Sequence, residues 1–177
     1  MTRGVTRRLV TFGIGPAWYA VDVAHVERVL RYESVVPIPT MPSWMEGIIE
    51  YHGRVVPVID LRRRFGLPGD VAVAGRRLLV LTLGDDVVAA TVDRVVDVRP
   101  VADDAIAPPP RLARGMAGEF LIGVVRRPEG MVFVLDVARL LTPDDHQVID
   151  SCLEYPEVPL AAGQDAVVPA AGYSSDV

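Results

Sequence analysis

The sequence contains no lysine, and this absence excludes two large classes of enzyme. All 18 of its basic residues are arginine. Schiff-base chemistry needs a lysine amine, and the phosphate loop of the Walker type needs a lysine that contacts the nucleotide phosphates. The sequence therefore supports neither kind of catalysis.

Cysteine and long apolar runs are scarce as well. Cys152 is the only cysteine, which excludes an intramolecular disulfide and a zinc site built on thiolate pairs and is typical of a reducing compartment. Unbroken apolar stretches such as 131–135 are far shorter than the ~20 apolar residues of a membrane helix. Glycines at 13 and 15 interrupt the first apolar run before it could form a signal-peptide core. These features predict a cytoplasmic protein.

Catalytic and metal-binding patterns are also missing. The histidines at 25, 52 and 146 have no partner at the short spacings that metal sites use. None of the serines stands in a Gly-x-Ser-x-Gly turn, and the Gly-x-Gly at 13–15 lacks the third glycine of a dinucleotide-binding loop. The sequence predicts no catalytic residue, no metal site and no bound cofactor.

Charge is distributed unevenly along the chain. Residues 1–142 carry a net charge of +2, whereas residues 143–177 carry seven acidic residues and no basic one. Arginines cluster at 62–64, 76–77 and 126–127, but the small net charge and the lack of an aromatic-rich strand beside them argue against nucleic-acid binding. These clusters are better explained by solvated faces or protein contacts.

Short runs of valine, isoleucine and leucine, separated by glycine, proline and aspartate, predict an all-β domain with short helices. Three short helices are expected to begin at Asp22, Asp60 and Asp136. The first, over 22–31, is predicted because valines three residues apart would share one helix face. The ten predicted strands are 9–14, 17–21, 35–39, 47–51, 54–59, 78–83, 87–92, 95–101, 120–125 and 131–135.

The C-terminal segment predicts one more helix and then a tail. Thr142 suits an N-cap, Pro143 suits the first helical position, and two aspartates follow at the positive end of the helix dipole. This helix is expected over 143–154. The composition of 155–177 predicts a disordered acidic tail, so the folded domain is expected to span 8–142.

The sequence repeats itself over a long interval. Gly53 and Gly130 each begin a segment that runs glycine, apolar strand, aspartate and short helix. A second match has each position 71 residues after its counterpart: 11–13 with Asp22, and 82–84 with Asp93. We expect two copies of a unit of about 70 residues, each with five strands that close into a small barrel.

The segment 47–59 predicts a β-hairpin. His52 and Gly53 form its two-residue turn, where backbone φ is expected to be positive. Pro57 lacks the N–H of a strand ladder, so its strand is expected at a sheet edge or at a bulge. An edge hairpin with Glu50 and His52 near its tip suits a docking surface for another protein.

These segments together resemble the CheW-like family of chemotaxis coupling proteins. The stretch MPSWMEGIIEYHGRVVPVIDLRRRFGL, residues 41–67, is similar to the signature segment of that family. Residues 9–31 resemble its first hairpin and helix, 78–98 the strands that open its second half, and 120–141 its closing hairpin and helix. The resemblance implies two intertwined five-stranded barrels of SH3-like type.

The resemblance also implies a function. Proteins of this family are adaptors that couple the cytoplasmic tips of chemoreceptors to the regulatory domain of the histidine kinase CheA, so any membrane contact would be indirect. His52 replaces the family's turn arginine by an imidazole that is mostly neutral near pH 7, and Glu50 adds an anion where the family has asparagine. The receptor and kinase contacts so implied are Val26, Val29, Gly47, Glu50, His52 and Gly53.

Two further expectations follow. The alternative function is that of a regulator that binds a small molecule, for example a nucleotide between the two barrels.

The substitutions Val26→Asp and Gly47→Asp are expected to weaken receptor binding while leaving the fold largely intact.

Overall fold

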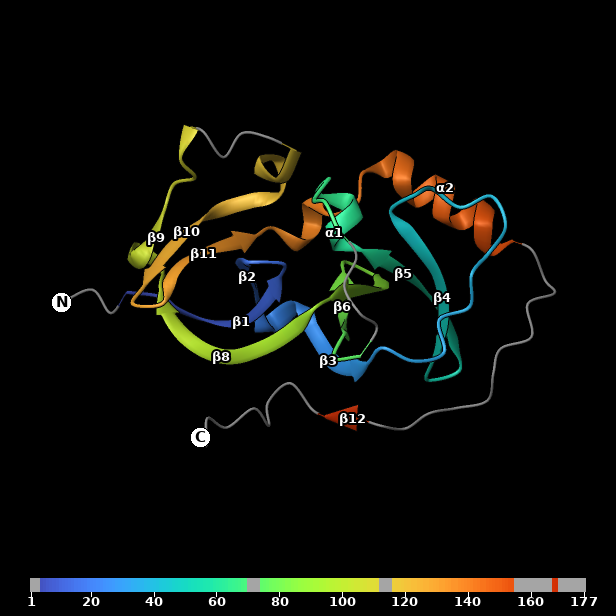
Figure 1. Cartoon of the computed structure of the whole chain (residues 1–177), viewed down its shortest axis with the longest axis horizontal. Helices are drawn as coiled ribbons and strands as arrows, with labels where there is room; N and C mark the ends of the chain where they lie inside the picture. The colour runs from blue at the N-terminus through green and yellow to red at the C-terminus, as the bar shows by residue number, and fades with distance from the viewer. Residues whose placement is uncertain (1–3, 70–73, 112–115, 155–166, 169–177) are drawn as a thin grey trace.

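The computed structural model describes residues 4–69, 74–111, 116–154 and 167–168, and it consists of two six-stranded sheets with a few short helices (Figure 1). The first sheet has the order β8-β1-β2-β11-β10-β9, and the second has the order β12-β3-β6-β7-β5-β4. In Figure 1 the first sheet lies on the left and the second on the right. The prediction of an all-β fold with short helices is confirmed.

The strands of the first sheet are β1 (Thr6–Ile14), β2 (Ala17–Asp22), β8 (Arg94–Ala102), β9 (Ile106–Ala107), β10 (Leu121–Arg127) and β11 (Gly130–Leu135). Those of the second are β3 (Val26–Arg31), β4 (Met45–Tyr51), β5 (Arg54–Asp60), β6 (Arg77–Leu83), β7 (Asp86–Val92) and β12 (Val167–Val168). The helices are α1 (Leu61–Arg64) and α2 (Pro143–Leu153), and the 3₁₀ turns are η1 (Val23–His25), η2 (Asp103–Ala105), η4 (Met116–Phe120) and η5 (Val137–Arg139).

Each sheet takes strands from both halves of the sequence. The first sheet joins β1 and β2 to β8, β10 and β11, and the second joins β6 and β7 to β3, β4 and β5. Four strand pairs join the two halves. Two are parallel, β2 with β11 and β5 with β7, and two are antiparallel, β1 with β8 and β3 with β6. Five strands of the first sheet, β8-β1-β2-β11-β10, correspond in order to five of the second, β3-β6-β7-β5-β4. The predicted duplication and the intertwining of its two copies are therefore confirmed, while the closure of each unit into a barrel stays a prediction.

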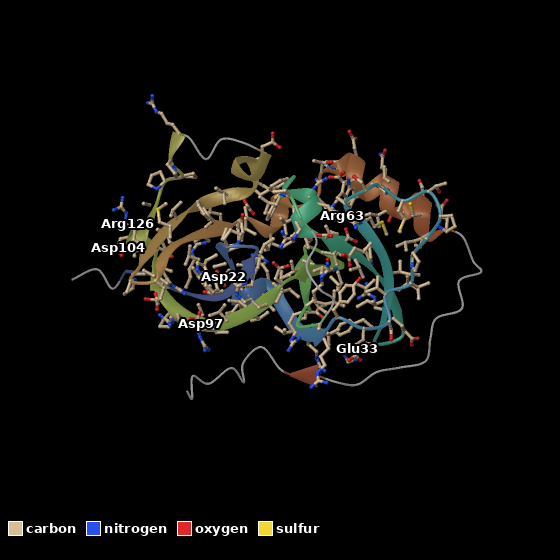
Figure 2. All side chains as sticks on the ribbon, in the orientation of Figure 1. Asp22, Glu33, Arg63, Asp97, Asp104 and Arg126 are labelled. Atoms are coloured by element: carbon tan, nitrogen blue, oxygen red, sulfur yellow. The ribbon has the colours of Figure 1, made fainter. Side chains whose placement is uncertain are left out.

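The buried apolar side chains form three clusters. The largest contains residues from both sheets, while the other two lie on the remaining face of each sheet. Neighbouring residues of one strand therefore belong to different clusters: Leu9 and Val10 on β1, and Leu78 and Leu79 on β6. Successive strand residues point to opposite faces, which explains why these strands are continuous apolar runs. Figure 2 shows side chains filling the space between the ribbons.

The helix predicted over 22–31 is wrong. Asp22 caps only the turn η1, accepting a hydrogen bond from the Ala24 N–H at 2.9 Å, and the chain continues as the strand β3. Val26 pairs with Leu81, and the register then shifts before the next pair.

The register shift explains the misleading pattern. Val26 and Val29 face Leu81 and Leu79 on β6, so Glu27 is the extra residue of a β-bulge. One inserted residue turns the strand repeat of two into a spacing of three. Two valines three residues apart therefore lie on the same strand face, and they imitate the spacing of a helix.

The predicted strand 35–39 is also wrong, since only Val36 pairs with β4, in a single bridge to Ile48. Pro37 and Pro39 have no N–H and cannot extend a ladder. The short strand β9 was not predicted. The other nine predicted strands agree with the structure to within a few residues at each end.

The aspartates predicted to begin the other helices do act as caps. Asp60 accepts a hydrogen bond from the Arg63 N–H at 3.2 Å, and Asp136 accepts one from the Ala138 N–H at 3.0 Å. The elements they cap are single turns, α1 and η5.

Most of the segment 155–177, predicted to be a disordered tail, lies outside the described residues. Val167 and Val168 are the exception, since they form β12 and pair antiparallel with Leu30 and Val29 of β3. The prediction of disorder is corrected at these two residues, because β-branched side chains favour strands and the outer edge of β3 offers unpaired backbone groups.

Ending the chain at Glu154 is expected to expose this edge. N–H groups of successive strand residues point to opposite sides. Tyr32 donates to Arg76 on the β6 side. The Leu30 N–H therefore faces β6, and the Val29 N–H faces β12. Without β12, the Val29 amide should exchange with solvent at least about tenfold faster, because local opening governs exchange. Hydrogen exchange followed by NMR measures this, with the Leu30 amide as the internal control. Unchanged exchange at Val29 would show that β12 does not protect β3 in solution.

The helix α2 is fixed at its start by a capping box and an ion pair. The Thr142 hydroxyl accepts from the Asp145 N–H at 3.2 Å, and the Asp145 carboxylate accepts from the Thr142 N–H at 2.7 Å. The same carboxylate pairs with the Arg64 guanidinium at 2.5 Å. Burial raises the pKa of Asp145, but the hydrogen bonds from Thr142 and the Arg64 cation outweigh it, and the pKa is lowered overall.

Asp145→Asn is expected to lower the free energy of unfolding by about 1–2 kcal/mol near pH 7. Because the native pKa is lowered, this stabilisation is complete above the unfolded value of ~4 and is lost as the pH falls through the native value. Urea unfolding of the protein and the variant from pH 7 to pH 2 should show the difference shrinking in acid. Asp144→Asn, at an exposed neighbouring position, is the control, and a difference that persists at pH 2 would contradict the prediction.

Candidate functional site

The hairpin of β4 and β5 ends in the predicted two-residue turn. Tyr51 pairs with Arg54, and the two residues between them have positive φ, 51° at His52 and 72° at Gly53. Two-residue hairpin loops of type I′ need positive φ at both positions. The exposed His52 ring lies edge-on against the Tyr51 ring, with 4.3 Å between their centroids. The turn prediction is confirmed, and Tyr51 positions the imidazole at the tip.

Gly47 shapes the hairpin from within. It lies at the bulge between Met45 and Gly47 and has φ of 151°. A Cβ added at Gly47 would collide with the Val36 carbonyl and lie 3.1 Å from the Pro37 Cα. Val36 and Ile48 exchange two backbone hydrogen bonds of 2.9 Å over this glycine. The expectation that Gly47→Asp leaves the fold intact is therefore wrong, because any side chain here displaces backbone.

The second half of the chain repeats this arrangement. Gly123 stands at a bulge in β10, and a Cβ added there would collide with the Ala107 carbonyl of β9. Each bulge follows an aromatic residue whose carbonyl accepts from a capping aspartate: Trp44 from the Asp60 N–H at 2.8 Å, and Phe120 from the Asp136 N–H at 2.7 Å. The repeat of bulge and cap indicates that Gly47 and Gly123 have the same architectural role, each in its own sheet.

Of the two alternatives predicted for Pro57, the edge strand is wrong. A bulge is present next to Pro57, but it is the one at Gly47 in the partner strand β4. The strand β5 lies between β4 and β7, and β4 is the edge. Ile48, which faces Pro57, directs its N–H and its carbonyl to Val36, so this pair exchanges no ladder bonds. The parallel ladder with β7 begins one residue later, at Val58. A proline is tolerated here because no partner needs its missing N–H.

Val26 and Val29 are core residues. Their exposed fractions are 9% and 2%, and both pack in the cluster between the sheets. The expectation that Val26→Asp leaves the fold largely intact is wrong, because a carboxylate would enter this cluster. The residues that β3 exposes to solvent are Glu27 and Arg31. Glu27 is the extra residue of the bulge, and its carboxylate accepts a hydrogen bond from Thr82 at 3.2 Å.

The structure brings β3 and the hairpin together although they lie at different ends of the strand order. The Tyr51 side chain lies near Glu27: burial first and then the Glu27 carboxylate raise the pKa of Tyr51, and Arg28 opposes them. Side chains of two predicted contact segments therefore lie close together. Glu27 and Tyr51 were missed by sequence reasoning, and a glutamate between two buried valines was the only indication of the bulge.

A second set of polar side chains joins the same segments further along. Glu46 accepts from the Thr91 hydroxyl at 3.1 Å and lies 3.6 Å from Arg76. Burial first and then the neighbouring Glu46 carboxylate raise the pKa of Tyr32 to about 12. Burial also raises the pKa of Glu46, and the charge of Asp60 adds to this. These contacts fix β4 against the end of β3.

The hairpin tip is exposed to solvent and carries both charged and apolar side chains. Glu50, His52, Gly53, Arg54 and Val55 are all exposed, so charge of both signs lies beside apolar surface. Within the described ranges, no group of three or more histidine, cysteine, aspartate or glutamate side chains is placed to hold a metal ion. The helices described here are all too short or too polar to cross a membrane.

Known proteins are similar to this chain in both sequence and fold. A model of the CheW-like domain matches residues 8–144. The chain is 30% identical over 146 residues to the chemotaxis protein CheW of Treponema pallidum, covering 79% of this chain and 85% of that protein. It is 30% identical over 147 residues to CheW of Klebsiella aerogenes, with 83% and 89% covered.

A solved structure of a CheW protein has a similar fold. The scaffolding protein TtCheW from Thermoanaerobacter tengcongensis superposes with a TM-score of 0.73 at 26% identity, covering 80% of this chain and 96% of that one. The same two-sheet architecture thus occurs in a scaffold of chemotaxis. This chain belongs to the CheW-like family of chemotaxis adaptor proteins.

Proposed function

We propose that the protein is a non-enzymatic adaptor that couples the cytoplasmic tips of chemoreceptors to the regulatory domain of the histidine kinase CheA. Its site of action is then the cytoplasm, and it meets the membrane only through receptors. The observation that carries the proposal is the exposed hairpin tip of β4 and β5, whose Tyr51 lies near Glu27 on β3.

The geometry supports docking of a protein partner. Glu27, Glu50 and His52 lie at exposed turn or strand positions, whereas Val29 and Gly47 of the same strands are buried. Binding residues mounted on rigid elements lose little conformational freedom on association. The buried residues of the proposed contact set thus act by shaping the surface, and the exposed ones meet the partner.

The test is to mix the purified protein with the kinase regulatory domain and with a receptor-tip fragment. Isothermal titration calorimetry should detect binding to at least one of them at tens of micromolar or tighter. Glu50→Lys should weaken that binding by about 3- to 10-fold, the effect of a charge at an interface rim. Binding to neither partner would overturn the proposal.

Asp104→Lys is the matched control for this charge reversal. Asp104 is exposed on the first sheet (Figure 2), whereas Glu50 lies on the second. The control should leave both affinities unchanged. An equal loss in both variants would indicate a general effect of net charge and would remove the hairpin from the proposed contact surface.

His52→Arg is expected to strengthen coupling. A guanidinium is always charged and offers five donors, so it can form the bidentate contacts that an imidazole cannot. We expect affinity for the kinase domain or the receptor tip to rise about 2- to 10-fold, the effect of one partly exposed charge. Unchanged affinities, with a native circular-dichroism spectrum, would make the turn residue unimportant.

The alternative function, a regulator that binds a nucleotide between the sheets, stays a prediction. A ligand that binds only the folded state must raise its stability. A thermal-shift screen with purine nucleotides that shows no rise in melting temperature would remove this alternative.

A further inference from the structure

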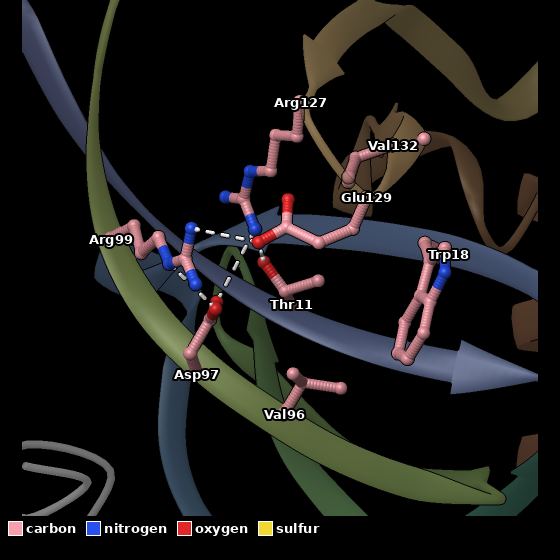
Figure 3. A pocket seen from close by; sticks show the side chains of 9 residues that line it. Thr11, Trp18, Val96, Asp97, Arg99, Arg127, Glu129 and Val132 are labelled. Atoms are coloured by element: carbon pink, nitrogen blue, oxygen red, sulfur yellow. Dashed lines mark hydrogen bonds and ion pairs between the residues drawn. The ribbon is translucent and has the colours of Figure 1, made fainter. Parts of the chain in front are cut away.

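A small cavity of about 120 Å³ opens in the first sheet, at the end where β10 turns into β11. Figure 3 shows its polar side chains grouped on one side and the Trp18 ring on the other. The lining residues come from five strands, β1, β2, β8, β10 and β11, and from one turn. They are Thr11, Trp18, Val96, Asp97, Arg99, Arg127, Glu129, Gly130 and Val132.

Arg127 is the unusual residue of this cavity. Its side chain is only 10% exposed, and its Nη1 donates to the Thr11 hydroxyl at 2.9 Å and to the Asp97 carboxylate at 3.4 Å. Its other terminal nitrogen, Nη2, is buried and has no hydrogen-bond partner among the described residues. A buried donor on a charged group is costly when it has no acceptor. Arg127, which lines the cavity, therefore carries one donor for which the described residues supply no acceptor.

The other charged side chains of the cavity do not supply an acceptor for this nitrogen. Asp97 is 15% exposed and pairs with the Arg99 Nε at 2.7 Å, so this carboxylate is already shared by two arginines. Glu129 lies on the turn after β10, is 57% exposed, and reaches Arg99 only at 3.6 Å. Glu129 is thus the loosely held carboxylate of the group, and an incoming anion would compete with it for Arg99.

The opposite wall is apolar. Val132 is buried, Trp18 is partly buried against the cluster inside the first sheet, and Val96 is exposed at 40%. The Arg94 guanidinium lies 4.4 Å from the centroid of the Trp18 ring, which helps to fix the ring. A ligand that suits the whole cavity has one anionic end for the arginines and a short apolar body for this wall.

We propose that this cavity binds the carboxylate of a small organic acid, with Arg127 and Arg99 holding the carboxylate and Trp18, Val96 and Val132 packing against its apolar body. Arginine and carboxylate match in geometry, since two parallel N–H donors meet two oxygens. The site lies on the first sheet and does not depend on the adaptor function proposed for the hairpin of the second.

The test is an NMR titration of the full chain with butyrate and with benzoate at low salt, followed at the Trp18 indole N–H, the Gly130 amide and the Arg127 Nε–H. We expect saturable shifts at these three groups. Butyramide and benzamide, which have the same shape without the charge, are the matched ligands and should give none. The N-acetyl α-amide of glutamate presents the carboxylate as a protein side chain does. Binding of this compound in place of the free acids would support the site and identify a partner protein as the source.

Three variants make the assignment specific. Arg127→Gln should lower the affinity at least about tenfold, as expected for the loss of a charge-assisted hydrogen bond. Glu129→Gln, at an exposed turn position, should raise the affinity because it removes the competing anion. Arg126→Gln, at the exposed neighbouring position, should change it by less than about twofold.

Several results would overturn the proposal. No saturable shift up to about 50 mM acid, equal shifts with the amides, or equal affinity in Arg127→Gln and Arg126→Gln would each exclude a carboxylate site. Detection of a bound water at the Arg127 Nη2 with no response to any acid would show that water alone satisfies this donor. Because Glu129→Gln changes only an exposed side chain, its unchanged affinity would count against the site even if Arg127→Gln failed to fold.

Discussion

Gly47→Ala is expected to lower the free energy of unfolding by at least ~4 kcal/mol. Only a few structural causes produce a loss of this size in a single substitution. Two causes act together here. Alanine strains a backbone held at φ of 151°, and its methyl group would displace the Val36 carbonyl, breaking the pair of hydrogen bonds between Val36 and Ile48. Urea unfolding monitored by circular dichroism measures the change.

Two other glycines separate these causes. Gly53 has φ of 72° but open space around its Cβ position, so Gly53→Ala should cost only about 1 kcal/mol from backbone strain. Gly123→Ala meets the Ala107 carbonyl and should be costly through collision. If Gly47→Ala proved no more destabilising than Gly53→Ala, the close approach of Val36 to β4 would be excluded.

Val29→Asp is expected to be as damaging, with a loss of about 4 kcal/mol or more, or no folded protein at all. Val29 is 2% exposed in the cluster between the sheets. A carboxylate placed there loses its hydration without gaining a partner, which is far more costly than deleting a methyl group. Its melting temperature and urea midpoint, compared with those of the wild type, measure the loss.

Val55→Asp is the matched control, since Val55 is 44% exposed on β5 of the same sheet. It should change stability by less than about 1 kcal/mol. Equal stability of the two variants would contradict the burial of Val29. A binding defect in Val29→Asp is informative about docking only if the variant is shown to be folded, whereas a defect in Val55→Asp reports on the hairpin surface directly.

The hairpin shows how much of the candidate site local sequence can predict. His52 and Gly53 were assigned to a two-residue turn with positive φ, and the structure has both. This succeeded because turn conformation depends on neighbouring residues alone. The partners of the turn could not be predicted in the same way, since Tyr51 approaches Glu27 across a stretch of chain that no local pattern connects.

The error at β3 has a related cause. Three valines at intervals of three predict a helix from sequence, and the same intervals arise in a strand with one bulge residue. Pairing with β6 decided between them, because the edge of β6 offers hydrogen-bond partners to the whole segment 26–31. Tertiary pairing overrides local periodicity whenever the partner strand is already in place.

The sequence by itself excluded reactions that need a lysine, and it was enough to predict the all-β fold, the aspartate caps and the duplication. These depend on residue types and on contacts within a few residues. Only the tertiary structure decided that strands are exchanged between the halves, that Gly47 lies under Val36, and that Arg127 meets Thr11 from 116 residues away. The physical reason is that burial and backbone pairing act between surfaces brought together by folding, and a linear pattern does not specify which surfaces meet.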